Sequence, residues 1–226
     1  MYLSRLVEMA RFGGIAFVVL TLGGFIAAGD AGYEDGSKIA AYFAGHRERI
    51  LVANHVAAIG LLAFVAWAWW IMNAIERLQT DSRRLGLAIF VSASMLVAVE
   101  FGCIALTMTL ALIANKPVDP SLARALVNGA QDFSYVEYFP QALLLFFFGA
   151  AILETRLTAT WLGWLAFALV PLSLIGAVPG LGLDAPVALL TSAWFLAASI
   201  LALRAEAGTK ARAEAGKALA TAAQLE

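Results

Sequence analysis

LGLAIFVSASMLVAVEFGCIALTMTLALIA, residues 85–114, decides the fold class of this chain. A helix needs roughly 20 apolar residues to cross a bilayer, and this stretch exceeds that length. It contains one acidic residue, Glu100, close to its middle. A carboxylate at that depth costs about 2.5 kcal/mol or more, so Glu100 is expected to face a partner, a cavity or an ion inside a helical bundle.

The composition of the whole chain agrees with this stretch. Of its 226 residues, 62% are hydrophobic and 14% are charged, and the mean hydropathy is +0.84. Soluble domains carry about 25% charged residues, so we predict an all-α integral membrane protein with short loops. The net charge of −1 gives no basis for nucleic-acid binding.

The apolar runs predict six transmembrane helices. Two amphipathic segments, residues 37–50 and 121–133, are predicted to be extracellular and to precede the second and fourth spans. We expect one transmembrane domain over residues 1–204 and an Ala-rich cytoplasmic tail over residues 205–226. The predicted spans are residues 13–28, 50–75, 85–114, 134–155, 161–178 and 187–203.

Basic residues are divided unequally between the two sides of this topology. The cytoplasmic side of a membrane protein carries the excess of Lys and Arg. Both termini are therefore predicted to be cytoplasmic, in a multi-pass protein of a cell membrane. The richer side holds Arg5, Arg11, Arg77, Arg83, Arg84, Arg156, Arg204, Lys210, Arg212 and Lys217, and the other side holds Lys38, Arg47, Arg49, Lys116 and Arg124.

Three tryptophans, Trp67, Trp69 and Trp70, lie toward the end of the second span. Tryptophan is enriched at membrane interfaces, where its ring contacts acyl chains and its N–H finds a polar partner. We therefore expect this cluster at an interface, and an aromatic ligand box is the alternative.

Three segments carry a resemblance to known proteins: IAAYFAGHRERIL (residues 39–51), SLARALVNGAQDF (residues 121–133) and RLTATWLGWLAFAL (residues 156–169). They resemble a group of small six-span bacterial membrane proteins, common in actinobacteria, that belong to or lie near a domain-of-unknown-function family. The resemblance implies a six-helix fold in the bacterial inner membrane. It brings no established activity, so it assigns no catalytic residue.

Polar residues from three predicted spans can converge on one pocket. With both termini inside, His55 lies about 8 Å below the outer end of the second span at 1.5 Å per residue. Glu137 and Gln141 are one turn apart on the outer half of the fourth span. We therefore predict an outward-facing polar pocket around Glu100. Its candidate ligand-binding residues are Glu100, His55, Asn54, Glu137, Gln141 and Tyr138.

The residue inventory does not support an enzyme. The two histidines, His46 and His55, are not placed for bis-histidine haem ligation, and no Ser-His-Asp set is apparent. Cys103 is the only cysteine, so no thiolate metal cluster forms. A metal held by His55, Glu100 and Glu137 requires side chains at different depths. We therefore expect no catalytic residue, no metal and no cofactor.

Several readings of the polar cluster stay open. The first is that it binds or moves a small apolar or amphipathic ligand or a lipid, and a proton or ion pathway is a variant of this reading. The second is that the polar network is purely structural. In that case the chain is a non-catalytic, partner-docking subunit of a membrane complex, either a homo-oligomer or joined to another membrane protein through small residues such as Gly13, Gly14, Gly23 and Gly24. Membrane lipids are expected partners in both.

Overall fold

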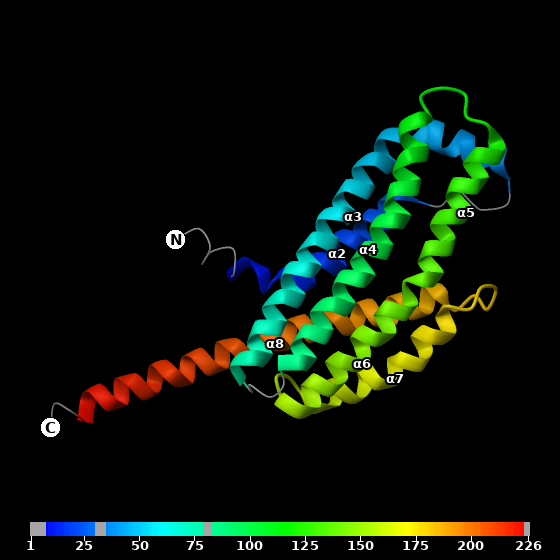
Figure 1. Ribbon diagram of the computed structural model, residues 1–226. Helices are drawn as coiled ribbons and strands as arrows, with labels where there is room; N and C mark the ends of the chain where they lie inside the picture. Colours follow the sequence, from blue (N-terminus) through cyan, green and yellow to red (C-terminus); the bar gives the residue numbers. More distant parts are fainter. Residues whose placement is uncertain (1–7, 30–34, 79–82, 224–226) are drawn as a thin grey trace.

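The computed structural model describes residues 8–29, 35–78 and 83–223, with side chains through Gly208. This part of the chain is helical and contains no strand, which confirms the predicted all-α class. Figure 1 shows a bundle from which the C-terminal part of the last helix projects. The helices are α2 (Gly13–Ala28), α3 (Gly36–Leu78), α4 (Arg83–Ile113), α5 (Pro120–Val136), α6 (Tyr138–Thr155), α7 (Thr160–Gly176) and α8 (Asp184–Ala223).

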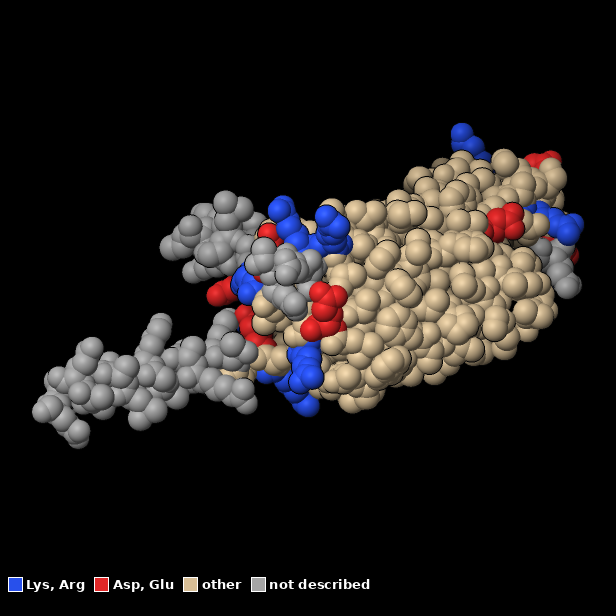
Figure 2. All heavy atoms as spheres, turned by 60° about the horizontal axis from the view of Figure 1, so that its bottom comes forward, with Lys and Arg blue, Asp and Glu red and all other residues tan. Residues whose placement is uncertain are grey.

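Apolar helices long enough to cross a membrane make up most of the bundle. Four have the required length and composition: α3, α4, the combined α5–α6 segment Pro120–Thr155, and residues Asp184–Gly208 of α8. Helices α2 and α7 are apolar but shorter, with 16 and 17 residues. In Figure 2, charged side chains gather toward two ends of the visible face, and a broad band between them lacks Lys, Arg, Asp and Glu. These features fit a multi-pass membrane protein, whereas the count of six spans stays a prediction.

The first and last helices lie side by side in the bundle. Helix α2 packs against α3 and α8, and the Arg11 guanidinium lies 3.9 Å from the Glu206 carboxylate. The start of α2 and the outgoing part of α8 are therefore at one end of the bundle, which we call the terminal end. The α4–α5 connection, residues 114–119, lies at the opposite end, which we call the distal end. The predicted cytoplasmic location of the terminal end stays a prediction.

Glycines allow α2 to approach α3 very closely. A Cβ atom added to Gly13 would lie 2.1 Å from the Ala63 carbonyl oxygen, and one added to Gly24 would lie 2.7 Å from the Ala53 carbonyl oxygen. Such contacts need a residue without a side chain, as is typical of helix pairs in membranes. Most of the small-residue face of α2 is thus covered by the chain itself. Gly23 alone of its four glycines has no atom within 4 Å of an added Cβ.

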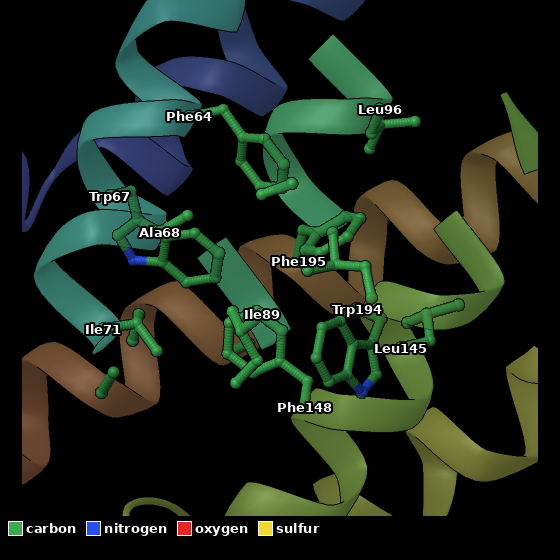
Figure 3. Close-up of a cluster of buried hydrophobic side chains, with 14 of the residues drawn as sticks. Phe64, Trp67, Ala68, Ile71, Ile89, Leu96, Leu145, Phe148, Trp194 and Phe195 are labelled. Atoms are coloured by element: carbon green, nitrogen blue, oxygen red, sulfur yellow. The ribbon is translucent and has the colours of Figure 1, made fainter. Parts of the chain in front are cut away.

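The main core is aromatic and corrects the prediction for the tryptophan cluster. Trp67 is 0% exposed and Trp70 is 5% exposed, whereas Trp69, at 39%, faces outward. The Trp67 ring stacks on Phe148 of α6 at a centroid distance of 5.3 Å, and Phe148 meets Trp194 of α8 edge-to-face at 5.5 Å. Figure 3 shows these side chains facing one another from α3, α6 and α8. Two of the three tryptophans are therefore core residues because three helices meet at their level, which a single-helix pattern does not reveal.

A second, smaller core extends the bundle at the distal end. Ile39 and Phe43 of α3 pack there against Leu110 of α4 and Val127 of α5. The segment 37–50, predicted as a separate amphipathic helix, is instead continuous with the second span within α3 and differs only by a kink at His46, whose φ is −124°. The apolar face of each amphipathic segment is thus buried against its neighbours in the bundle.

The N-terminus of α5 is fixed by a side-chain cap. The Asp119 carboxylate accepts hydrogen bonds from the backbone N–H groups of Ser121 and Leu122 and from the Ser121 hydroxyl. These hydrogen bonds, led by that of the Ser121 hydroxyl, lower the pKa of Asp119, because they favour the charged form. Pro120 occupies the first helical turn, where its missing N–H is not needed. The cap therefore fixes where α5 begins, and α5 packs against α3 and α4.

Candidate functional site

A cavity of about 600 Å³ lies between α2, α3, α4, α5 and the first turn of α8. Helix α2 packs on α3 and α8, and helix α5 packs on α3 and α4. Both α2 and α5 thus pack on α3, and the cavity lies between α2 and α5. Its walls are largely apolar, and they include Phe25 and Ile26 of α2, Ile50 of α3, Val127 of α5 and Ala188 of α8.

Two carboxyl groups, those of Glu100 and Glu137, line this cavity side by side. Both side chains belong to the lining of this cavity, Glu100 from α4 and Glu137 from the chain between α5 and α6. Glu137 lies at the junction of α5 and α6, where Pro140 cannot donate a hydrogen bond to the carbonyl group of Val136, so the regular helix is interrupted. The two residues, called the carboxyl pair below, therefore place two acidic groups in one cavity between α4 and the α5–α6 junction.

Other polar groups of the cavity are partnered across helices. The Asn54 side-chain amide of α3 donates to the Thr107 hydroxyl of α4 at 3.0 Å. The Tyr138 hydroxyl donates to the Asp184 carbonyl oxygen at 2.8 Å, which fixes the start of α8 against α6. These hydrogen bonds join helices across the cavity and hold its walls in place.

A smaller cavity of about 110 Å³ lies on the other side of the carboxyl pair. Glu100 and Glu137 line both cavities, and Ala188 also belongs to both. Gln141 lines the smaller one, where its amide donates to the hydroxyls of Ser173 and Thr191 at 3.1 and 3.2 Å. Toward the terminal end, Phe195 of the aromatic core also lines this cavity. The carboxyl pair thus separates a large distal cavity from a small one above the aromatic core.

The rim of the large cavity is clamped at the end of α2. The Ala28 carbonyl oxygen accepts hydrogen bonds from the Tyr42 hydroxyl at 2.7 Å and from the Arg49 guanidinium at 3.2 Å. Arg49 also donates to the Tyr42 hydroxyl at 2.7 Å. Gly29 ends the helix with a φ of 75°, a conformation that suits glycine. The clamp fixes where α2 stops and therefore where the cavity begins.

The structure places four of the six predicted site residues in the large cavity: Glu100, Asn54, Glu137 and Tyr138. Gln141 lies in the smaller cavity. His55 is on an exposed face of α3, where its Nδ1 lies 2.7 Å from the Leu51 carbonyl oxygen, so the predicted convergence of His55 on the pocket is wrong. Adjacent side chains of a helix point about 100° apart. Asn54 can therefore line the cavity while the next residue, His55, is exposed. That any of them binds a ligand stays a prediction.

Residues that sequence reasoning missed come mostly from α2 and α8. Phe25 and Ile26 form one wall, and Asp184 adds a third carboxyl group. No local signal identifies them, because their helices reach the cavity only through packing on α3 and α6. Ser134 also lines the cavity, and its hydroxyl lies 3.9 Å from the Cys103 sulfur. Helical spacing could have predicted this position, because Ser134 lies one turn before Glu137.

No group of three His, Cys, Asp or Glu side chains in the described ranges is placed to hold a metal ion. The hypothetical site of His55, Glu100 and Glu137 does not assemble, because His55 points away from the cavity.

The fold and cavity define an all-helical bundle with several helices long and apolar enough to cross a membrane. No protein-family model, no curated protein and no solved structure matches the chain. The resemblance to six-span bacterial membrane proteins stays a prediction, and the function has to be argued from the cavity.

Proposed function

We propose that the chain binds, and by extension moves, a small amphipathic molecule or lipid in the large cavity. The observation that carries this proposal is the combination of about 600 Å³ of space, largely apolar walls and a small set of polar groups that includes the carboxyl pair. Ligand pockets in proteins commonly have volumes of about 300–1,000 Å³, apolar walls and a few polar groups that fix orientation. The apolar part of the ligand lies along α2 and α5, and its polar head meets Glu100 and Glu137.

The wall formed by α2 supports entry from the side. Phe25 is 39% exposed and Ile26 is 73% exposed, and both line the cavity. Exposed apolar side chains at this level fit contact with lipid acyl chains. A ligand dissolved in the bilayer therefore reaches the cavity between α2 and α5 without crossing water. If the terminal end is cytoplasmic, as the charge distribution predicts, the cavity faces outward.

A partner-docking role is the second candidate, and one observation favours it. A shallow groove of about 350 Å³ runs along α2 and α3, lined by small residues that include Gly23 and Ala53. Gly13, Gly14 and Gly24, which were expected to form the docking face, instead pack against the chain's own helices. Among the described residues of α2, the part of its small-residue face that lines this groove is therefore the candidate docking surface.

Filling the cavity tests the main proposal. Ala188 borders both cavities beside the carboxyl pair, so Ala188→Trp is expected to remove bound ligand by occupying its space. Ala105→Trp is the matched control, because Ala105 is exposed on α4 and lines neither cavity. Native mass spectrometry of gently extracted protein measures the retained molecules and the oligomeric state together.

The expected result is an amphiphile retained by the wild type and by Ala105→Trp and lost from Ala188→Trp. Identical bound molecules in all three proteins contradict the proposal. A stable oligomer with an empty cavity favours the partner-docking role.

A further inference from the structure

The charged groups that line the large cavity are all acidic. Glu100, Glu137 and Asp184 line it, and no Lys, Arg or His does so within the described chain. Arg49 lies at the rim, where the Ala28 carbonyl and the Tyr42 hydroxyl hold its guanidinium. A largely apolar cavity whose charged side chains are all acidic is electrostatically complementary to a cation.

The carboxyl pair has no cationic partner of its own. None of the ion pairs found among the described residues includes Glu100 or Glu137. Acidic residues in the apolar part of a membrane protein are generally paired or take part in ligand or proton binding. Here both carboxyl groups line one apolar cavity. Two carboxylates that share an apolar cavity repel each other unless a proton or a cation lies between them.

We infer that the ligand of the large cavity is an amphipathic organic cation, whose ammonium-like head displaces a proton from Glu100 and Glu137. This inference rests on the proposed function and names the chemical class of its ligand. Aromatic rings support the assignment, since Phe25, Tyr135 and Tyr138 line the same cavity. Organic cations bind to aromatic faces as well as to carboxylates.

The exchange conserves charge and breaks no covalent bond other than one O–H. One monovalent cation enters, one carboxyl proton leaves to water, and the charge of the buried site stays the same. The titratable groups that face the pair are Cys103 from α4, Tyr135 from α5, Tyr138 from α6 and Asp184 from α8. Helix α2 contributes only apolar side chains and backbone, and α3 contributes Asn54 and, at the rim, Tyr42.

A pair of ions with the same shape and opposite charge tests the inference. Wild-type protein in lipid nanodiscs is dialysed against tetraphenylphosphonium or tetraphenylborate, with empty nanodiscs subtracted. Tetraphenylphosphonium is expected to bind, and tetraphenylborate is not. If tetraphenylphosphonium displaces a proton, linkage requires its apparent affinity to rise with pH. The rise is up to about tenfold per pH unit over the range in which the protein without the cation still holds that proton. A pH-sensitive dye in weak buffer is expected to report about one proton released for each cation bound.

Two substitutions assign the effect to the pair. Glu100→Gln and Glu137→Gln each replace one carboxyl group with an amide of the same size, which can still donate a hydrogen bond. Each is expected to weaken tetraphenylphosphonium binding by at least about tenfold, because the cation then faces one carboxylate in place of two. Asp132→Asn is the matched control, because this substitution removes the same formal charge. Asp132 is exposed on α5 and lines neither cavity.

The outcomes separate this inference from the proposed function. If both ions bind equally and Ala188→Trp abolishes both, the cavity binds amphiphiles but the cation assignment is wrong. If tetraphenylphosphonium binds without pH dependence or proton release, the exchange is wrong. If neither ion binds and mass spectrometry finds an empty cavity, both proposals fail. The wild-type measurements decide these cases even if a glutamine variant does not fold.

Discussion

Trp67→Ala is expected to lower the free energy of unfolding by about 3 kcal/mol. Trp67 is fully buried, and its ring contacts Phe64, Phe148 and Phe195 at the centre of the aromatic core. Removal of a buried Trp in soluble proteins costs about 3–5 kcal/mol through lost transfer energy and a new cavity. In a bilayer the lipid also solvates the side chain, so the packing contribution dominates and the lower end is expected. Steric-trap unfolding in lipid measures the change.

Two variants of the same helix control this experiment. Trp69→Ala removes an equal side chain from an exposed position, and a change within about 0.5 kcal/mol is expected. Trp67→Phe keeps an aromatic ring and removes an indole N–H that has no hydrogen-bond partner in the described part of the protein. It is therefore expected to cost much less than alanine. Equal destabilisation by Trp67→Ala and Trp69→Ala would show that the tryptophans act at an interface and not in a core.

Gly13→Ala is expected to destabilise the protein by about 2 kcal/mol, since overpacking typically costs about 1–3 kcal/mol. The added Cβ would lie 2.1 Å from the Ala63 carbonyl oxygen, a backbone atom that cannot rotate away. The helices α2 and α3 must therefore separate. Because α2 forms one wall of the large cavity, ligand retention is expected to fall as well. Unfolding and native mass spectrometry on one preparation report both effects.

Gly23→Ala provides the matched control on the same helix. A Cβ at Gly23 meets no atom within 4 Å, and alanine favours helix over glycine by about 1 kcal/mol. We expect unchanged or slightly increased stability and normal ligand retention. Destabilisation by Gly23→Ala of the size expected for Gly13→Ala would mean that this face of α2 contacts a second molecule and not only α3.

Much of the candidate site follows from the sequence because an acidic residue in an apolar helix has few acceptable positions. Glu100 was expected to face the bundle interior, and it lines the cavity beside Glu137. Asn54 and Tyr138, which were predicted at the same pocket, also line this cavity. The same reasoning failed for His55, whose adjacent position on α3 lies on the exposed face. Adjacent side chains of a helix point about 100° apart, so the position of Asn54 in the cavity does not carry over to His55.

The tryptophan cluster shows a different limit. Composition correctly identifies an apolar helix with aromatic residues toward one end, but it does not say how many neighbours surround that end. Trp67 becomes a core residue because α6 and α8 deliver Phe148 and Trp194 to its level. Interfacial preference of tryptophan is overridden where three helices offer close packing.

The amino-acid sequence alone determined the helical class and the apolar helices, because unbroken runs of apolar residues satisfy their backbone hydrogen bonds only as helices in a lipid environment. It also determined that Glu100 needs a protected partner. Only the tertiary structure decided what that partner is and where the cavity lies. Both depend on Glu137 reaching α4 from the α5–α6 junction, and on the ends of α2 and α8, which are fixed by contacts such as Tyr42 with Ala28 and Tyr138 with Asp184 that join residues distant in the chain.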